Sequence, residues 1–184
     1  AKHITNDLAI GLRVSLEQAE KIKLALSSNP REKLLLNASE NGDQLNPIKL
    51  GVNKEDVAKP AYKTLVDGII KPRLNEIYAM VSAELKKAGL LASTPAGVVL
   101  SSGGALTVNA DKVCKRAMSM PVRIAQLDGN QKTKVQLTGL TDEINNPIFS
   151  VPQGLIIYAS QQGEINSSAS FSGIGDIVQK IPSG

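Results

Sequence analysis

The sequence predicts an α/β protein that carries a smaller inserted unit over roughly residues 15–87. Three patterns point to this class. An amphipathic segment begins at Ser15, the apolar run Val98 to Leu100 leads into a glycine turn, and a second apolar run, Val122 to Ile124, follows a helical segment. Strands that alternate with helices along the chain are typical of α/β folds.

The composition excludes several other classes of protein. Hydrophobic residues make up 42% of the chain and charged residues 21%, which is usual for a globular domain. No apolar run approaches the roughly 20 residues that cross a bilayer. The net charge of +4 is spread along the chain and aromatic residues are 3% of it, so we expect no nucleic-acid binding. One Cys and one His exclude a disulfide and a thiolate or imidazole metal site, and they favour a reducing, cytoplasmic compartment.

Two helices are predicted at the start of the chain. Thr5 and Asn6 precede apolar residues at helical spacing, which predicts a first helix with one of these residues as its N-cap. Ser15 and Gln18 have the spacing of a capping box and open a second helix. This second helix should end before Pro30, because a residue that precedes proline avoids the helical conformation.

The middle of the chain reads as a hairpin followed by a long helix. Short apolar runs around Asn41-Gly42 predict the hairpin over 32–57, and its second strand would carry the alternating Ile48, Leu50 and Val52. Residues 54–87 have apolar side chains on one helical face, with Pro60 and Pro72 as interruptions. Pro72 should kink this helix or mark the junction of two.

The last third returns to the main unit. The strand at 98–100 is followed by a helix over 109–118 and a strand at 122–124. Residues 126–143 are polar and predicted to form a loop, and a final helix spans 147–159. The segment 161–184 is rich in Ser and Gly, which is typical of a flexible linker.

The glycine turn after the first strand is the first candidate site. The strand delivers Ser102, Gly103 and Gly104 to the carboxyl edge of the sheet, where open α/β folds bind ligands. Glycine lets a flat base or a sugar approach the backbone closely. Taken alone, the same residues would also fit a plain strand-to-helix turn.

One face of the second helix is the other candidate. Glu20, Lys23 and Ser27 are spaced i, i+3 and i+7, so they share a face. A carboxylate there can accept hydrogen bonds from ribose hydroxyls, and the Lys can lie along the sugar and base. An ordinary solvated helix face would show the same pattern.

Three blocks of sequence, in this order, resemble the cell division protein FtsA family of actin-like ATPases. They are residues 3–23, the run VVLSSGGA at 98–105, and 137–159, where Asn146-Pro147 begins the last helix. The Glu-x-x-Lys pattern of Glu20 and Lys23 is also similar to the adenosine-contacting helix of DnaK-type chaperones and of MreB. The Ser101-Ser102 pair departs from the Thr-Gly that is common in FtsA at this point.

The resemblance implies the fold and domain boundaries. It covers about residues 3–160 and implies the second, ribonuclease H-like domain of an actin-like ATPase. Subdomain IIA would comprise 1–14 and 88–160, the inserted α/β subdomain IIB would comprise 15–87, and 161–184 would be the linker.

The resemblance also implies an ATP site. Ser102, Gly103, Gly104 and Ala105 would approach the adenosine from one side, and Glu20, Lys23 and Ser27 from the other. The two phosphate loops and the acidic residues that manage Mg²⁺ would lie upstream of Ala1. We therefore assign no catalytic residue and expect at most weak ATPase activity from the full-length protein and none from this segment.

The partners implied by the resemblance are those of a cell-division adaptor. The inserted subdomain would receive the C-terminal peptide of FtsZ through Arg73, with Lys71 and Lys63 nearby, because a guanidinium can grip a carboxylate with two hydrogen bonds. The protein would polymerise into filaments and would lie on the cytoplasmic face of the inner membrane at the division site. An amphipathic membrane helix is expected beyond Gly184.

Two other functions share this fold and stay open at this point. One is a PilM-like ATPase of type IV pilus assembly, whose partner would be a pilus peptide. The other is a phosphotransferase of the sugar-kinase or acetate-kinase kind, whose substrate residues would lie mainly upstream.

Overall fold

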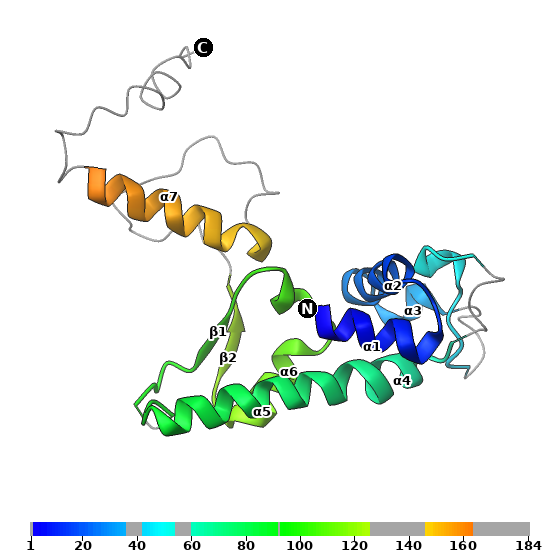
Figure 1. Ribbon diagram of the computed structural model, residues 1–184, viewed down its shortest axis with the longest axis horizontal. Helices are drawn as coiled ribbons and strands as arrows, with labels where there is room; N and C mark the ends of the chain where they lie inside the picture. The colour runs from blue at the N-terminus through cyan, green and yellow to red at the C-terminus, as the bar shows by residue number, and fades with distance from the viewer. Residues whose placement is uncertain (1, 36–41, 54–59, 92, 126–145, 164–184) are drawn as a thin grey trace, which may run out of the picture.

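The computed structural model describes residues 2–35, 42–53, 60–91, 93–125 and 146–163 (Figure 1). The first part contains α1 (Lys2–Leu12), α2 (Leu16–Ser28), α3 (Arg31–Leu34) and the 3₁₀ turn η1 (Ile48–Leu50). The long helical stretch comprises α4 (Tyr62–Leu65), the π-helical segment η2 (Val66–Ile70) and α5 (Lys71–Lys87). The rest comprises β1 (Val98–Leu100), the 3₁₀ turn η3 (Gly103–Leu106), α6 (Ala110–Met118), β2 (Val122–Ile124), the 3₁₀ turn η5 (Pro147–Phe149) and α7 (Ser150–Gly163).

The two predicted N-terminal helices are present, but the start of the first was predicted wrongly. Helix α1 begins at Lys2, so Thr5 and Asn6 lie inside it and neither is the N-cap. Thr5 instead turns its hydroxyl toward α2. The capping box of α2 is confirmed, because the Ser15 side chain accepts from the Gln18 N–H and the Gln18 side chain accepts from the Ser15 N–H.

The predicted hairpin forms only in part. Leu35 and Leu45 make an isolated antiparallel bridge, while Asn41 lies outside the described residues. The expected strand at Ile48 and Leu50 is wrong, because this segment is a 3₁₀ turn. A local hydrogen bond explains the 3₁₀ turn. The Asn46 side chain accepts from the Ile48 N–H and so starts a turn that competes with strand pairing.

The long helix runs through Pro72 without a break. Its backbone is helical from Tyr62 to Lys87, but the five residues before Lys71 form a π-helical segment in which the Lys71 N–H reaches the Val66 carbonyl. Proline has no N–H to donate to the preceding turn, and a π-helical turn is one way for a helix to absorb that disturbance. Pro72 was predicted to kink this helix or to mark the junction of two. It lies in the first turn of α5, directly after the π-helical segment, and so marks a junction.

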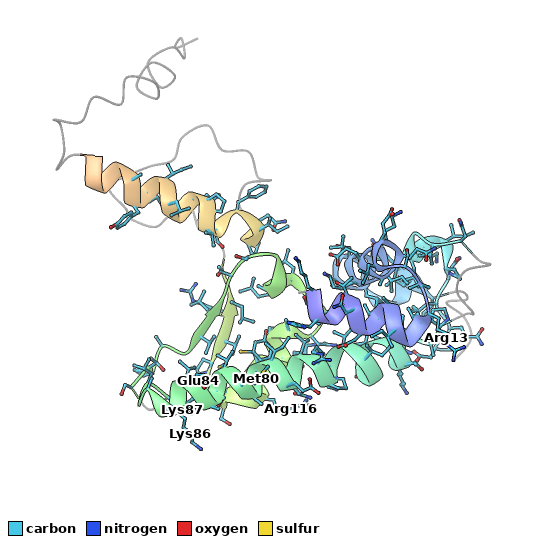
Figure 2. All side chains as sticks on the ribbon, in the orientation of Figure 1. Arg13, Met80, Glu84, Lys86, Lys87 and Arg116 are labelled. Atoms are coloured by element: carbon cyan, nitrogen blue, oxygen red, sulfur yellow. The ribbon has the colours of Figure 1, made fainter. Side chains whose placement is uncertain are left out.

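The C-terminal end of α5 is closed by a Schellman motif. The N–H of Gly89 bonds the Lys86 carbonyl and the N–H of Leu90 bonds the Leu85 carbonyl, with Gly89 at φ 70°. Lys86 and Lys87 lie in the last turn of α5, and Lys115 and Arg116 lie in the last turn of α6. Positive side chains at these positions interact favourably with the negative end of the helix dipole. Figure 2 shows Lys86, Lys87 and Arg116 pointing away from the body of the protein.

The predicted strands pair in parallel. Val98 lies opposite Val122 and Leu100 opposite Ile124, and α6 is the crossover helix between them. Helix α6 packs against α5 and against β2, and α7 lies beyond the end of the strand pair that is farther from α5 (Figure 1). Parallel pairing directs the carboxyl ends of both strands to the same edge, which is the edge that carries η3.

Buried side chains form one continuous core. It joins Ile4 and Leu8 of α1 to Ile22 and Leu26 of α2, and it continues into α5 and to Val113 of α6. Residues of both predicted subdomains share it, and the boundaries at 15 and 87 stay a prediction. Cys114 is fully buried in this core, as expected for a small apolar side chain.

Helix α7 begins where the sequence indicated. Asn146 is the N-cap of η5, because its side chain accepts from the Ile148 N–H, and Pro147 follows it. The helix extends to Gly163, into the segment predicted to be a linker, and 164–184 lie outside the described residues together with the loop predicted at 126–143. Among the described helices, none has the length and apolar content to cross a membrane.

Candidate functional site

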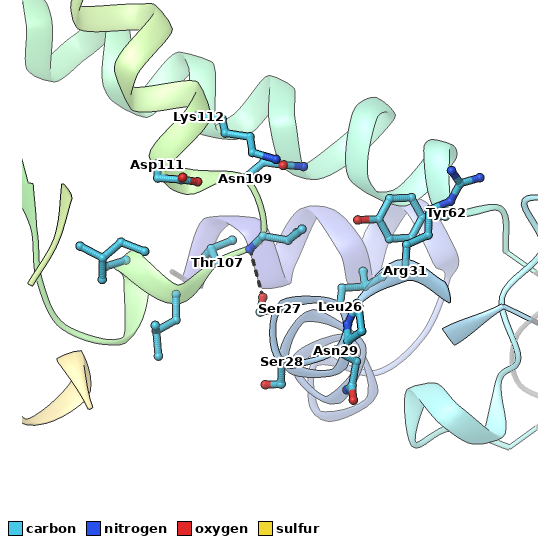
Figure 3. Close-up of a pocket in the computed structure, with 15 residues that line it drawn as sticks. Leu26, Ser27, Ser28, Asn29, Arg31, Tyr62, Thr107, Asn109, Asp111 and Lys112 are labelled. Carbon is cyan, nitrogen blue, oxygen red and sulfur yellow. Dashed lines mark hydrogen bonds between the residues drawn. The ribbon is translucent and has the colours of Figure 1, made fainter. Parts of the chain in front are cut away.

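A pocket of about 490 Å³ opens at the carboxyl edge of the strand pair (Figure 3). One wall is the end of α2, from Leu26 to Asn29, with Pro30 and Arg31 behind it. The facing wall runs from Ala105 of η3 to Lys112 of α6, and Ile124 at the end of β2 contributes to the lining. Its lining mixes apolar side chains with hydroxyl, amide and charged groups.

Ser27 holds the two walls of the pocket together. Its Oγ accepts a hydrogen bond of 3.2 Å from the Val108 N–H (Figure 3). The same Oγ donates one of 2.7 Å to the Lys23 carbonyl. Of the residues predicted to contact adenosine, Ser27 and Ala105 both line the pocket. The structure therefore brings together one residue from each of the two predicted segments.

Glu20 and Lys23 lie on α2 outside the pocket lining. The Lys23 ammonium is turned inward, 2.7 Å from Glu20 Oε2 and 3.2 Å from Thr5 Oγ1, and the Lys23 residue is only 6% exposed. The Thr5 hydroxyl donates to the same Glu20 oxygen at 2.6 Å. Lys23 therefore anchors Glu20 to α1, which differs from the expectation that Lys23 lies against the sugar and base.

The glycine turn combines a strained serine with two open glycines. Ser102 has φ 66° and ψ 180°, a conformation that is normally reserved for glycine, and its N–H donates to the Pro147 carbonyl at 3.0 Å. A Cβ added to Gly104 would meet nothing within 4 Å, and one added to Gly103 would make an ordinary contact with Ile148. Neither glycine has a positive φ. The fold itself therefore does not require glycine at 103 or 104.

Arg73 is engaged inside the chain. Its Nε and Nη2 donate to the two oxygens of Asp7 at 2.5 and 2.9 Å, and its Nη1 donates to Glu76 at 2.7 Å. These hydrogen bonds lower the pKa of Asp7 and raise that of Arg73. Lys71 pairs with Asp67, and the Lys63 side chain is exposed. The guanidinium that was expected to grip a partner thus already fixes α5 to α1.

Several residues of the site were missed from the sequence. Arg31 lies 5.4 Å from the centre of the Tyr62 ring and pairs with Asp43 at 2.6 Å, and both Arg31 and Tyr62 line the pocket. The contact joins segments thirty residues apart, so no local pattern signals it. Asn109 also lines the pocket, in a left-handed conformation that its short polar side chain tolerates.

The described residues offer no group of three or more His, Cys, Asp or Glu side chains that could hold a metal ion. The arrangement is thus that of an α/β unit with a pocket where its parallel strands end, which is where open α/β folds bind ligands.

Comparison with known proteins shows the family. The family model for "Cell division protein FtsA" matches residues 1–154. The chain therefore belongs to the FtsA family of cell division proteins.

Curated relatives agree with this assignment. The FtsA of Pseudomonas aeruginosa is 28% identical over 170 residues, which are 92% of this chain and 37% of the relative. The FtsA of Agrobacterium fabrum is 28% identical over 156 residues, 85% of this chain and 32% of the relative. That of Bacillus subtilis is 30% identical over 125 residues, 67% of this chain and 26% of the relative. The chain thus spans about a third of the length of the relatives it matches.

Proposed function

We propose that this chain is the part of an FtsA-type cell-division adaptor that holds the adenosine of ATP. The adaptor would self-associate into filaments and link FtsZ to the membrane. Membership of the FtsA family supports the division role over the pilus-assembly and phosphotransferase alternatives. The fold implied by the family, a domain of an actin-like ATPase, agrees with the mixture of helices and strands.

Two observations carry the nucleotide proposal: the pocket at the strand ends, and the neighbouring turn at Gly103 and Gly104, where the fold does not require glycine. Ser27 and Ala105 both line the pocket, and Gly103 and Gly104, which lie outside its lining, precede Ala105 on an exposed turn. Since neither backbone angle nor packing requires these glycines, a ligand that lies against the backbone supplies a reason for them. The adenine base would enter the pocket between Ser27 and Ala105, and ATP would bring phosphates that this segment does not bind.

Photoaffinity labelling locates the base. The full-length protein that carries this segment is irradiated with 8-azido-ATP and digested with trypsin. We expect the label in peptides 24–31 and 88–112, which contain the two pocket walls, and we expect excess ATP to remove it. Labelling confined to other peptides would refute the proposed site.

The second part of the proposal concerns the FtsZ C-terminal peptide. Arg73 makes two hydrogen bonds to Asp7 and one to the exposed Glu76. The contact of Arg73 with Glu76 is the one that an acidic partner would replace. The side chain of Glu76 is 60% exposed, against 24% for Asp7, so Glu76 is the easier carboxylate to displace. Lys71 and Lys63, which are close in the sequence, would add positive charge.

Binding of a fluorescent FtsZ C-terminal peptide to the full-length protein tests this contact. Arg73→Ala should weaken binding roughly fivefold, the size expected for a solvent-exposed ion pair. Glu76→Gln should strengthen binding because it removes the competing carboxylate. Arg123→Ala, an exposed arginine on β2, is the matched control and should change nothing. Unaltered binding by both Arg73→Ala and Glu76→Gln would exclude this docking site.

A further inference from the structure

The Thr5, Glu20 and Lys23 side chains form a closed triangle of hydrogen bonds between α1 and α2. Thr5 Oγ1 donates to Glu20 Oε2 at 2.6 Å, and the Lys23 ammonium donates to that oxygen at 2.7 Å and to Thr5 Oγ1 at 3.2 Å. Thr5 is 7% exposed and Lys23 is 6% exposed. Two buried donors thus converge on one carboxylate oxygen.

The other oxygen of Glu20 is left open. Every hydrogen bond that Glu20 makes within the described residues goes to Oε2, whereas its side chain is 43% exposed. Thr5, which lies on a different helix, thus adds a second donor to the oxygen that Lys23 already contacts. The arrangement fixes the direction of the carboxylate while keeping Oε1 accessible.

The charge of Glu20 selects what Oε1 can bind. Burial raises the pKa of Glu20, but the hydrogen bonds from Lys23 and Thr5 outweigh it and hold the pKa below its usual value. An ionised carboxylate only accepts hydrogen bonds, so its ligand must donate. Neighbouring hydroxyls of a sugar can do this, while phosphate oxygens cannot.

The position of Glu20 relative to the pocket is also fixed by the helix. Ser27, which lines the pocket, lies on the same helix face two turns further along, about 10 Å along the axis. A nucleoside with its base in the pocket and its sugar along α2 would bring the sugar hydroxyls toward Glu20. Residues of α2 would then contact both the base, near Ser27, and the sugar, near Glu20.

We propose that Thr5 is a positioning residue for sugar recognition: with Lys23 it fixes the Glu20 carboxylate so that Oε1 accepts hydrogen bonds from the 2′- and 3′-hydroxyls of a ribonucleotide. This inference rests on the proposed binding of ATP. Lys23 would then contribute to binding through Glu20, without contacting the nucleotide. Helix α1, which carries Thr5, would contribute to the preference for ribose over deoxyribose.

The test compares dissociation constants for ATP and 2′-deoxy-ATP in the full-length protein. The natural protein should prefer ATP about tenfold, the value of one hydrogen bond to a charged group. Thr5→Val, which keeps the shape and removes the hydroxyl, should reduce this preference to about twofold or less. Thr5→Ser should restore it, and Thr64→Val on the exposed surface of α4 is the matched control. Thr5→Ala replaces Thr5→Val if the latter does not fold, as judged by circular dichroism.

The outcomes separate this inference from the proposed function. If the natural protein fails to bind ATP, the proposed function is refuted and this inference with it. If ATP binds with a preference over 2′-deoxy-ATP that Thr5→Val or Thr5→Ala leaves unchanged, only the role of Thr5 is overturned. Loss of the preference in Thr5→Ser would also contradict it, because the hydroxyl is then present.

Discussion

Replacing Gly97 by alanine is expected to destabilise the protein by about 2–4 kcal/mol, combining the strain of a left-handed residue with a steric overlap. Gly97 has φ 80°, and a Cβ at this position would lie 2.1 Å from the Pro121 carbonyl oxygen. That carbonyl accepts the Val98 N–H at 2.8 Å and so begins the pairing of β1 with β2. The overlap is with backbone, so relief requires the strands to separate.

Gly89→Ala is the matched control for this prediction. Gly89 also has a positive φ, 70°, but a Cβ there meets nothing within 4 Å. It should therefore cost only the conformational strain, about 1 kcal/mol. Urea denaturation of both variants measures the difference, and equal losses of unfolding free energy would show that β1 and β2 do not approach as closely as described.

Local signals in the sequence predicted much of the fold. The capping box at Ser15 and Gln18 gave the correct start of α2, and the proline after Asn29 gave its end. The short apolar runs at 98–100 and 122–124 became the parallel strands. These elements were predictable because capping, proline geometry and apolar clustering act within a few residues of the chain.

The errors arose where local alternatives compete. Alternating apolar residues after Pro47 suggested a strand, but the Asn46 side chain satisfies the Ile48 N–H and favours a 3₁₀ turn. Thr5 and Asn6 have the chemistry of helix caps, but the helix begins earlier and Thr5 serves a tertiary contact. Residue type alone does not distinguish a cap from a polar group that another helix uses.

The candidate site was predictable as a pair of segments but not as a set of contacts. Spacing placed Glu20, Lys23 and Ser27 on one face of α2, and the glycine turn followed from its position after a strand. The inward rotation of Lys23 depends on Thr5, fifteen or more residues away. The pocket contact of Arg31 with Tyr62 depends on how α3 and α4 meet, which no periodicity in the sequence encodes.

The described glycines differ in whether the fold requires them. Gly97 and Gly89 have backbone angles that side chains rarely adopt, so the fold requires glycine there. Gly104 has neither a positive φ nor a neighbour within 4 Å of an added Cβ. A side chain at Gly104 is therefore compatible with the fold, and its effect reports on what lies across the turn.

Gly104→Val is expected to weaken ATP binding about tenfold or more, because its methyl groups would project from the turn onto which the adenosine is proposed to lie. The fold should stay intact, since a Cβ at this position meets nothing within 4 Å and Gly104 does not have a positive φ. Gly154→Val in α7 provides the matched control, because an added Cβ there also meets nothing within 4 Å.

The dissociation constant for ATP of the full-length protein, measured by calorimetric titration for these two valine variants, tests the nucleotide pocket most directly. If a nucleoside binds between α2 and the turn after β1, Gly104→Val should lose affinity for ATP and Gly154→Val should not. The two variants should have equal melting temperatures. Natural affinity in a folded Gly104→Val protein would contradict a nucleotide at this turn.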